Sequence, residues 1–166
     1  MRLEQEIASL EERHALAHGR YVTLATAESA TAGGIASRLT AIAGSSTYVL
    51  GGIVAYSNEA KTTLLSVAKG TLSQFGAVSE EVAREMSQGA RDSFHAEVGV
   101  SNTGIAGPGG ATPNKPVGLF YISLSTPDRT LVQRFVFDGD RESNRSKAED
   151  AALLLVRDYL LQCIDS

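Results

Sequence analysis

Short apolar, β-branched runs alternate with longer helix-like segments along most of this chain, and this alternation restricts its fold more than any other feature. Residues 21–26, for example, are typical of a buried strand, and residues 35–43 after them are interpreted as a helix. Repeated strand–helix units indicate a largely parallel sheet covered by helices. The expected strands are 21–26, 51–56, 97–102, 117–125 and 131–137. The expected helices are 3–18, 35–43, 80–94 and 141–164, with a short helix after Asn58 that carries Lys61 and Leu64-Leu65.

Helix-end signals support several of these boundaries. Gly19 is expected to end the first helix, and Asn58 and Ser79 have the positions of N-caps. The last two strands flank Thr126-Pro127-Asp128-Arg129, a turn sequence that predicts an antiparallel hairpin. The 166 residues are therefore expected to form a single three-layer α/β/α domain, 1–166, with a mixed sheet of about five strands.

Composition excludes several classes of function. The net charge of −4 argues against binding to a nucleic-acid backbone, which requires a basic surface. No apolar run approaches the length of a membrane span, and the N-terminus lacks a signal core. Cys163 is the only cysteine, which fits a reducing compartment, so we expect a cytoplasmic protein with no nucleic-acid or membrane partner.

The common cofactor and nucleophile motifs are missing from the sequence. It contains no P-loop, no G-x-G-x-x-G dinucleotide fingerprint and no G-x-S-x-G nucleophile elbow. His14 and His18 stand four residues apart on the first helix, but no third metal ligand follows nearby. The sequence predicts neither a metal nor a cofactor.

Three polar segments are unusual for a purely structural role. Glu28-Ser29-Ala30-Thr31 follows the first buried strand, where ligands collect in open α/β sheets. The glycine-rich stretch from Thr103 to Gly110 follows another strand, and its backbone can approach a ligand closely. As isolated patterns, the first is also explained by a helix cap and the second by a flexible loop.

The remaining segment contains a serine, a tyrosine and a lysine near one predicted strand: Ser46, Tyr56 and Lys61. Serine is a weak nucleophile until a base takes its proton. Lysine can be that base if burial lowers its pKa. From spacing alone, solvated surface residues remain the alternative.

Together, these segments resemble the CinA C-terminal domain family over nearly the whole chain. The resemblance lies in ordered blocks, including Glu28-Ser29-x-Thr31-x-Gly33, Gly44-Ser45-Ser46, Tyr56-Ser57-Asn58-Glu59-Ala60-Lys61, Gly76-Ala77-Val78-Ser79, Gly104-Ile105-Ala106-Gly107-Pro108 and Lys115-Pro116-Val117-Gly118. Stand-alone members of that family include nicotinamide-nucleotide amidase. The resemblance implies an anticodon-binding-domain-like fold, a homo-oligomer, and metal-free Ser/Lys hydrolysis of nicotinamide mononucleotide, or a similar small nucleotide, to the nicotinate form and ammonia.

The site expected from this resemblance has Lys61, assisted by Tyr56, as the base. Ser46 is the first choice as nucleophile and Ser29 the second, and the sequence does not order them. Arg141 and Arg145, at the start of the last helix, are expected to bind the phosphate. The expected substrate-binding residues are Glu28, Thr31, Ser45, Thr103, Gly104, Ala106, Gly107, Arg141 and Arg145.

Two positions depart from the family pattern Glu-Ser-Cys-Thr-Gly-Gly. Ala30 replaces the cysteine and Ala32 replaces the first glycine. These changes favour one alternative, a catalytically silent nucleotide-binding or regulatory relative. A second alternative, independent of these positions, is an amidase that acts on a different small amide.

Overall fold

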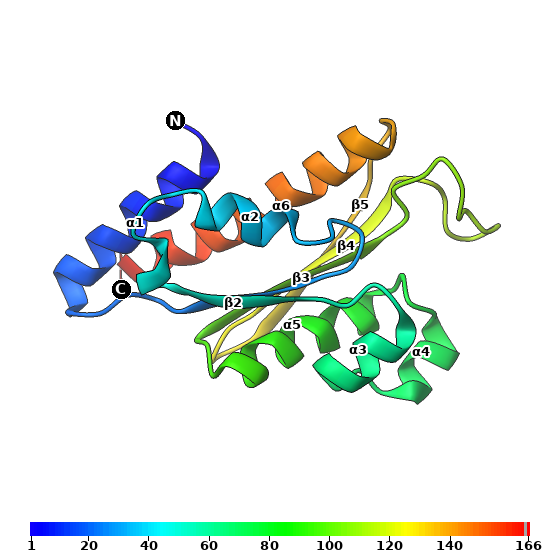
Figure 1. Cartoon of the computed structure of the whole chain (residues 1–166), viewed down its shortest axis with the longest axis horizontal. Coiled ribbons are helices and arrows are strands. Elements are labelled where there is room, and N and C mark those ends of the chain that lie inside the picture. The colour runs from blue at the N-terminus through cyan, green and yellow to red at the C-terminus, as the bar shows by residue number, and fades with distance from the viewer. Residues whose placement is uncertain (165) are drawn as a thin grey trace.

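The computed structural model describes residues 1–164 and 166 and is built on a mixed five-stranded sheet (Figure 1). The strand order is β2-β1-β3-β4-β5. β1 pairs in parallel with β2 and β3, whereas β4 pairs antiparallel with β3 and β5. The strands are β1 (Leu24–Glu28), β2 (Val49–Val54), β3 (Val98–Gly104), β4 (Leu119–Ser125) and β5 (Thr130–Val136).

Helices cover both faces of the sheet, which confirms the predicted α/β/α class. In Figure 1, α1, α2 and α6 lie on one side, and α3, α4 and α5 lie on the other. No helix within the described residues is long and apolar enough to cross a membrane. The helices are α1 (Leu3–His18), α2 (Gly34–Thr40), α3 (Asn58–Leu65), α4 (Lys69–Phe75), α5 (Glu80–Phe94) and α6 (Arg141–Ile164), with a short 3₁₀ helix η1 (Ser45–Thr47).

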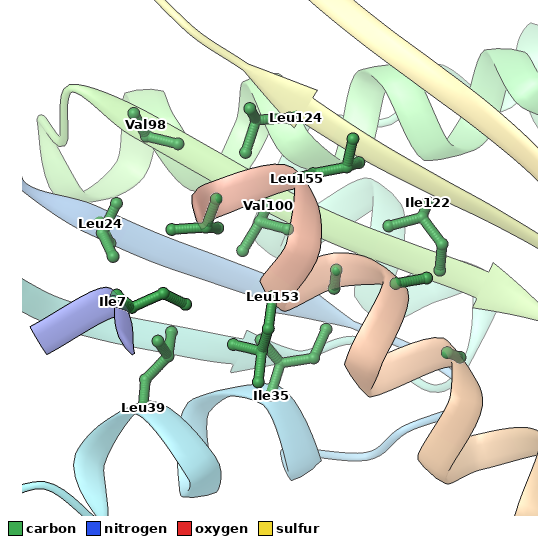
Figure 2. Close-up of a cluster of buried hydrophobic side chains, with 14 of the residues drawn as sticks. Ile7, Leu24, Ile35, Leu39, Val98, Val100, Ile122, Leu124, Leu153 and Leu155 are labelled. Carbon is green, nitrogen blue, oxygen red and sulfur yellow. The ribbon is translucent and has the colours of Figure 1, made fainter. Parts of the chain in front are cut away.

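The larger core fills the space between the sheet and the layer of α1, α2 and α6. Figure 2 shows Ile7 of α1, Ile35 and Leu39 of α2 and Leu153 of α6 in one cluster with Leu24 of β1, with Ile35 and Leu153 beside each other. All five side chains are essentially inaccessible to solvent. Each contributes about 1.5–3 kcal/mol by burial, so this cluster fixes the helical layer on the sheet.

The second core lies under α5, which packs unusually close to its neighbours. A Cβ at Gly99 of β3 would lie 2.0 Å from the Ser87 carbonyl oxygen, and one at Gly89 would lie 2.1 Å from the Leu65 carbonyl oxygen. These two glycines therefore permit close contact of α5 with the sheet and with the end of α3. This packing fixes the helix that carries Lys61.

The predicted helix ends are confirmed in two cases and wrong in one. Gly19 ends α1 with a left-handed φ of 74°, and the Ser79 hydroxyl accepts a hydrogen bond from the Val82 N–H at 3.3 Å. The N-cap of α3 is Ser57 instead of Asn58, because the Ser57 hydroxyl accepts from the Ala60 N–H at 3.0 Å. Asn58 is the first residue of the helix.

The strand boundaries also need correction. β1 begins three residues later than predicted and continues to Glu28, which pairs with Val54 of β2 and Asn102 of β3. β2 begins two residues earlier than predicted. Polar Glu28 looked like a loop residue in the sequence, but pairing on both sides keeps it in the sheet. α4 was not predicted; it has no fully buried residue, so its sequence carries no strong apolar period.

Candidate active site

A cavity of about 200 Å³ lies at the carboxyl ends of the three parallel strands. This is the edge at which open α/β sheets bind ligands. It is surrounded by five segments: the turn after β1, the start of α3, the segment before α5, the end of β3 and the start of α6. Its lining residues are Ser29, Ala30, Tyr56, Asn58, Lys61, Ala77, Val78, Thr103, Gly104, Ala106 and Arg141.

Lys61 projects from α3 into this cavity and is the largest fully buried side chain of the protein's described part, with 1% of its surface exposed. Its Nζ lies 3.0 Å from the Ser29 Oγ, 2.9 Å from the Ala55 carbonyl oxygen and 3.5 Å from the Tyr56 carbonyl oxygen. No described carboxylate forms a salt bridge with it. Burial lowers the pKa of Lys61 below its usual 10.5, because desolvation disfavours the ammonium ion.

Ser29 follows β1 directly and is 8% exposed. Its N–H donates to the Asn102 carbonyl oxygen at 3.2 Å, which continues the alignment of β1 with β3 by one residue. Its hydroxyl is thereby held beside the Lys61 amine. The structure thus brings together a buried amine and a nearly buried hydroxyl, although Ser29 was only the second choice from sequence.

Ser46, the first choice, is an exposed residue of η1 at the amino end of β2. Lys61 reaches the carboxyl end of that strand, about 17 Å away at the usual rise of 3.3 Å per residue. The expected pairing of Ser46 with Lys61 is therefore wrong. Ser45 is buried at the same distant end and does not line the cavity.

Glu28 and Thr31 hold the site's backbone instead of facing a ligand. The Glu28 carboxylate accepts hydrogen bonds from the Thr31 hydroxyl at 2.5 Å and from the N–H groups of Gly33, Ile35 and Ala36 at 3.0, 3.0 and 2.8 Å. With these four donors the carboxylate is fully occupied at the start of α2. Neither residue lines the cavity, so their predicted substrate contacts are not supported.

Tyr56 and Arg141 meet at the cavity mouth. The Tyr56 side chain is 63% exposed, and its hydroxyl accepts a hydrogen bond from Arg141 Nη2 at 3.3 Å. Arg141 Nη1 donates to the Gly107 carbonyl oxygen at 2.9 Å. The hydrogen bond between Tyr56 and Lys61 uses the backbone oxygen of Tyr56, and the tyrosine hydroxyl bonds to Arg141 instead, so the structure does not support the predicted proton relay through that hydroxyl.

Arg145 lies one turn further along α6 and does not line the cavity. Its Nη2 donates to the Thr31 carbonyl oxygen at 3.0 Å. It therefore supports the turn that contains Ser29 from behind, and the structure does not place it where it was expected to bind phosphate.

The glycine-rich segment from Thr103 to Gly110 forms part of the cavity wall. Thr103, Gly104 and Ala106 line the cavity. The Thr103 hydroxyl donates to the Ala77 carbonyl oxygen at 2.7 Å, which fixes the opposite wall. A Cβ at Gly104 would lie 2.3 Å from the Phe120 ring, so glycine is required there by packing. Gly107 contributes only its carbonyl oxygen to Arg141.

The expected site residues did not include five residues of this region. Ala30, Asn58, Ala77 and Val78 line the cavity, and Asn102 is buried directly behind the Ser29 turn. A signal for Asn102 was present: it is the last residue of the predicted strand 97–102, and in the structure it pairs with Glu28, the last residue of β1. Polar residues at the ends of adjacent parallel strands meet at one edge of the sheet.

A larger, more open depression of about 520 Å³ lies between α3 and α4 and shares Asn58 with the cavity. Its lining includes Glu59, Thr62 and Lys69 but no paired base and nucleophile. The depression has the larger volume, but only the smaller cavity contains a base beside a nucleophile. We therefore take the smaller cavity as the candidate active site. The fold and the smaller cavity together define an α/β protein with a buried serine–lysine pair at the carboxyl edge of its sheet.

Comparison with known proteins assigns a family to this arrangement. The CinA C-terminal domain profile matches residues 7–160, so the chain belongs to the CinA C-terminal domain family. A CinA-like protein of Citrifermentans bemidjiense is 52% identical over 140 residues, which cover 84% of this chain and 34% of that protein. A CinA-like protein of Sulfurihydrogenibium sp. is 49% identical over 139 residues, covering 84% and 35%. The chain thus spans about a third of these relatives' length.

Solved structures agree in fold over almost the full chain. The competence/damage inducible protein CihA from Agrobacterium tumefaciens superposes with a TM-score of 0.85 and 35% identity, covering 99% of this chain and 96% of that one. The competence damage-inducible protein A from Klebsiella pneumoniae gives a TM-score of 0.87 with 32% identity, covering 97% and 98%. The predicted family and fold class are therefore both confirmed.

Proposed function

We propose that this protein is an amidohydrolase that uses Ser29 as nucleophile and Lys61 as base, with nicotinamide mononucleotide as its substrate. The observation that carries the proposal is the 3.0 Å contact between the Lys61 amine and the Ser29 hydroxyl, both shielded from solvent. Lysine activates a serine only when its amine is uncharged, and burial favours that state here.

The partners of Lys61 support a defined direction of proton transfer. A neutral amine has two hydrogens and one lone pair. The carbonyl oxygens of Ala55 and Tyr56 can only accept, so they take the two hydrogens. The lone pair then faces Ser29, whose hydroxyl donates its proton to Nζ.

The proposed reaction has two halves. The Ser29 oxygen bonds to the carboxamide carbon as its proton moves to Lys61, and the carbonyl electron pair becomes an oxyanion. Collapse of that intermediate breaks the C–N bond, and the Lys61 proton leaves with ammonia. Water, deprotonated by Lys61, then attacks the acyl ester, releases the acid and returns the proton to Ser29.

The choice of substrate rests on the family resemblance and on charge. No carboxylate belongs to the cavity lining, whereas Arg141 stands at its mouth with a guanidinium suited to phosphate. We expect Arg141→Ala to raise the KM for the mononucleotide at least about tenfold, since a charge-assisted contact is worth about 1.5–3 kcal/mol. The KM for nicotinamide riboside, which lacks the phosphate, should change little.

The test is ammonia release from nicotinamide mononucleotide by the purified protein. Ser29→Ala and Lys61→Ala should each abolish turnover, and mass spectrometry of the quenched wild-type reaction should detect a nicotinoyl ester on Ser29. Ser46→Ala is the matched control, because that serine lies at the far end of β2, and it should retain full activity.

Three outcomes would contradict the proposal in whole or in part. Near-normal turnover by Ser29→Ala would remove that serine from the mechanism. Absence of ammonia from wild type, combined with tight binding of the mononucleotide, would instead favour a catalytically silent binding module, and turnover of other amides alone would change the substrate.

A further inference from the structure

Asn102 holds the turn that contains Ser29 at three points. Its carbonyl oxygen accepts from the Ser29 N–H at 3.2 Å, and its Oδ1 accepts from the Thr31 N–H at 3.3 Å. Its Nδ2 donates to the Thr31 hydroxyl at 2.6 Å. The N–H groups on both sides of Ala30 are therefore occupied by one buried residue of β3.

The N–H of Ala30, between them, donates to no protein acceptor in residues 1–164 or 166. Ala30 is buried and lines the cavity beside the Ser29 hydroxyl. A buried donor without a partner costs about 1–3 kcal/mol, so such a group is normally occupied by water or a ligand. A free N–H directly after a nucleophile is well placed for a developing oxyanion.

We propose that the Ala30 N–H is an oxyanion donor of this site and that Asn102 is the positioning residue that keeps this N–H free and aligned. The inference rests on the proposed function, because it requires Ser29 to attack a carbonyl carbon. As the Ser29 Oγ–C bond forms, the carbonyl electron pair moves to oxygen, and the Ala30 N–H donates to that oxygen. The bond strengthens only as negative charge develops, so it raises kcat instead of improving substrate binding.

The chemistry of the Asn102 contacts explains why an amide is required. The amide of Asn102 has an oxygen that accepts from the Thr31 N–H and a nitrogen that donates to the Thr31 hydroxyl oxygen. Aspartate would retain the acceptor, but it has no donor and would face the Glu28 carboxylate, to which the Thr31 hydroxyl already donates. Leucine has similar size and lacks both contacts.

The experiment compares Asn102→Leu and Asn102→Asp with Ser101→Ala. Ser101 is the neighbouring buried residue of β3; its hydroxyl donates to the Ala83 carbonyl oxygen at 2.6 Å, away from the cavity. All three variants lose a buried hydrogen bond of the same strand. We expect kcat for ammonia release to fall about 100-fold in Asn102→Leu, and less in Asn102→Asp, with KM within about threefold. Ser101→Ala should keep the wild-type kcat.

A second readout does not depend on the substrate. The rate at which a fluorophosphonate labels Ser29 should fall in parallel with kcat, because the phosphoryl oxygen also needs the donor. If wild type is labelled at Ser29 but does not hydrolyse the mononucleotide, the substrate proposal fails while the Asn102 inference is still decided by the labelling rates. If wild type shows neither reaction, both proposals fail.

The Ala30 N–H itself is tested by replacing Ala30 with lactic acid, which turns this N–H into an ester oxygen without changing a side chain. We expect kcat to fall about 100-fold with KM nearly unchanged. This variant also decides the matter if Asn102→Leu does not fold. Two results would overturn the inference. One is a kcat of the ester variant within about threefold of wild type, and the other is an equal loss of kcat in Ser101→Ala and Asn102→Leu.

Discussion

At the scale of single residues, Lys61 and Ala32 each adopt a state that is uncommon for their type. Lys61 is buried without a described salt-bridge partner, whereas most lysines keep their ammonium in water. Ala32 has a left-handed backbone with φ of 48°, a conformation that favours glycine. Burial makes Lys61 suitable as a base, whereas the strain at Ala32 has no visible benefit, because its side chain is exposed.

The state of Lys61 predicts the pH dependence of catalysis. Its pKa is lowered from 10.5 by burial, and only the uncharged amine can accept the Ser29 proton. We therefore expect kcat/KM to fall as the pH drops through this lowered pKa, with a single ionisation controlling the acidic limb. Ammonia release measured from about pH 5 to about pH 10 gives the profile. Lys61→Arg should be inactive throughout, because a guanidinium does not lose its proton; activity in that variant would contradict the assignment.

The backbone of Ala32 predicts that Ala32→Gly stabilises the protein. Glycine adopts the left-handed region without the steric cost, so the free energy of unfolding should rise by about 0.5–1 kcal/mol despite the entropy of glycine in the unfolded chain. Urea unfolding measures the difference. Ala41→Gly is the control, since Ala41 has an ordinary φ of −66° and should lose stability. Equal losses in both variants would show that Ala32 is not strained.

At the scale of secondary-structure elements, β1 and α2 are joined through one carboxylate. Glu28 ends β1 and accepts from three N–H groups at and just before the first turn of α2. α2 is only seven residues long, too short to be stable alone, so this cap and its apolar face hold it on the sheet. The same carboxylate anchors Thr31, and through it the turn that presents Ser29.

Glu28→Gln should therefore destabilise the fold. A glutamine offers one carbonyl oxygen and loses the negative charge beside those N–H groups, so we expect the free energy of unfolding to fall by about 1–3 kcal/mol. Glu142→Gln is the comparison, since Glu142 is an exposed acidic residue in the first turn of α6 and should cost only a few tenths of a kcal/mol. Chemical denaturation of the two variants distinguishes a buried cap from a surface charge.

The sequence predicted these elements better than it predicted the site. The order and type of nearly every element were predicted from the alternating strand and helix signals, together with Gly19, Ser79 and the turn at 126–129. Strand ends were less predictable, because polar Glu28 belongs to β1 only through its pairing with Val54 and Asn102. The choice between Ser29 and Ser46 could not be made without the arrangement of the strands, because both serines lie near predicted strands. The parallel pairing of β1 with β2 places Ser29 at the same edge of the sheet as Lys61.

At the scale of the whole molecule, the buried polar groups extend beyond the site. Glu11 of α1 is 0% exposed, and its Oε2 accepts from the Val22 N–H at 2.9 Å. Its Oε1 has no partner in the described part of the chain. Burial raises the pKa of Glu11 to about 8, against the lesser opposing effect of the Val22 hydrogen bond, so the folded protein holds a proton there that the unfolded chain releases.

The raised pKa of Glu11 predicts how the free energy of unfolding depends on pH. Because the folded state binds this proton more tightly, stability from Glu11 is complete below the ordinary pKa of 4.5 and is lost as the pH rises through about 8. Glu11→Gln should remove that loss, so the variant should be more stable than wild type above pH 8 by on the order of a few kcal/mol. Thermal or urea unfolding across this range is the measurement. Glu142→Gln, which changes an exposed carboxylate of α6, should leave the slope unchanged. An unchanged slope in Glu11→Gln would exclude the Glu11 carboxyl as its source.

The antiparallel return of β4 has a practical consequence for experiments. Gly104 pairs with Phe120 next to the cavity, whereas Ser125 pairs with Gly99 at the other end, so the tight turn at Asp128 projects from the end of the molecule opposite Ser29. A fluorophore or a surface tether attached at Asp128 can therefore report on folding, or immobilise the protein, while leaving substrate access open.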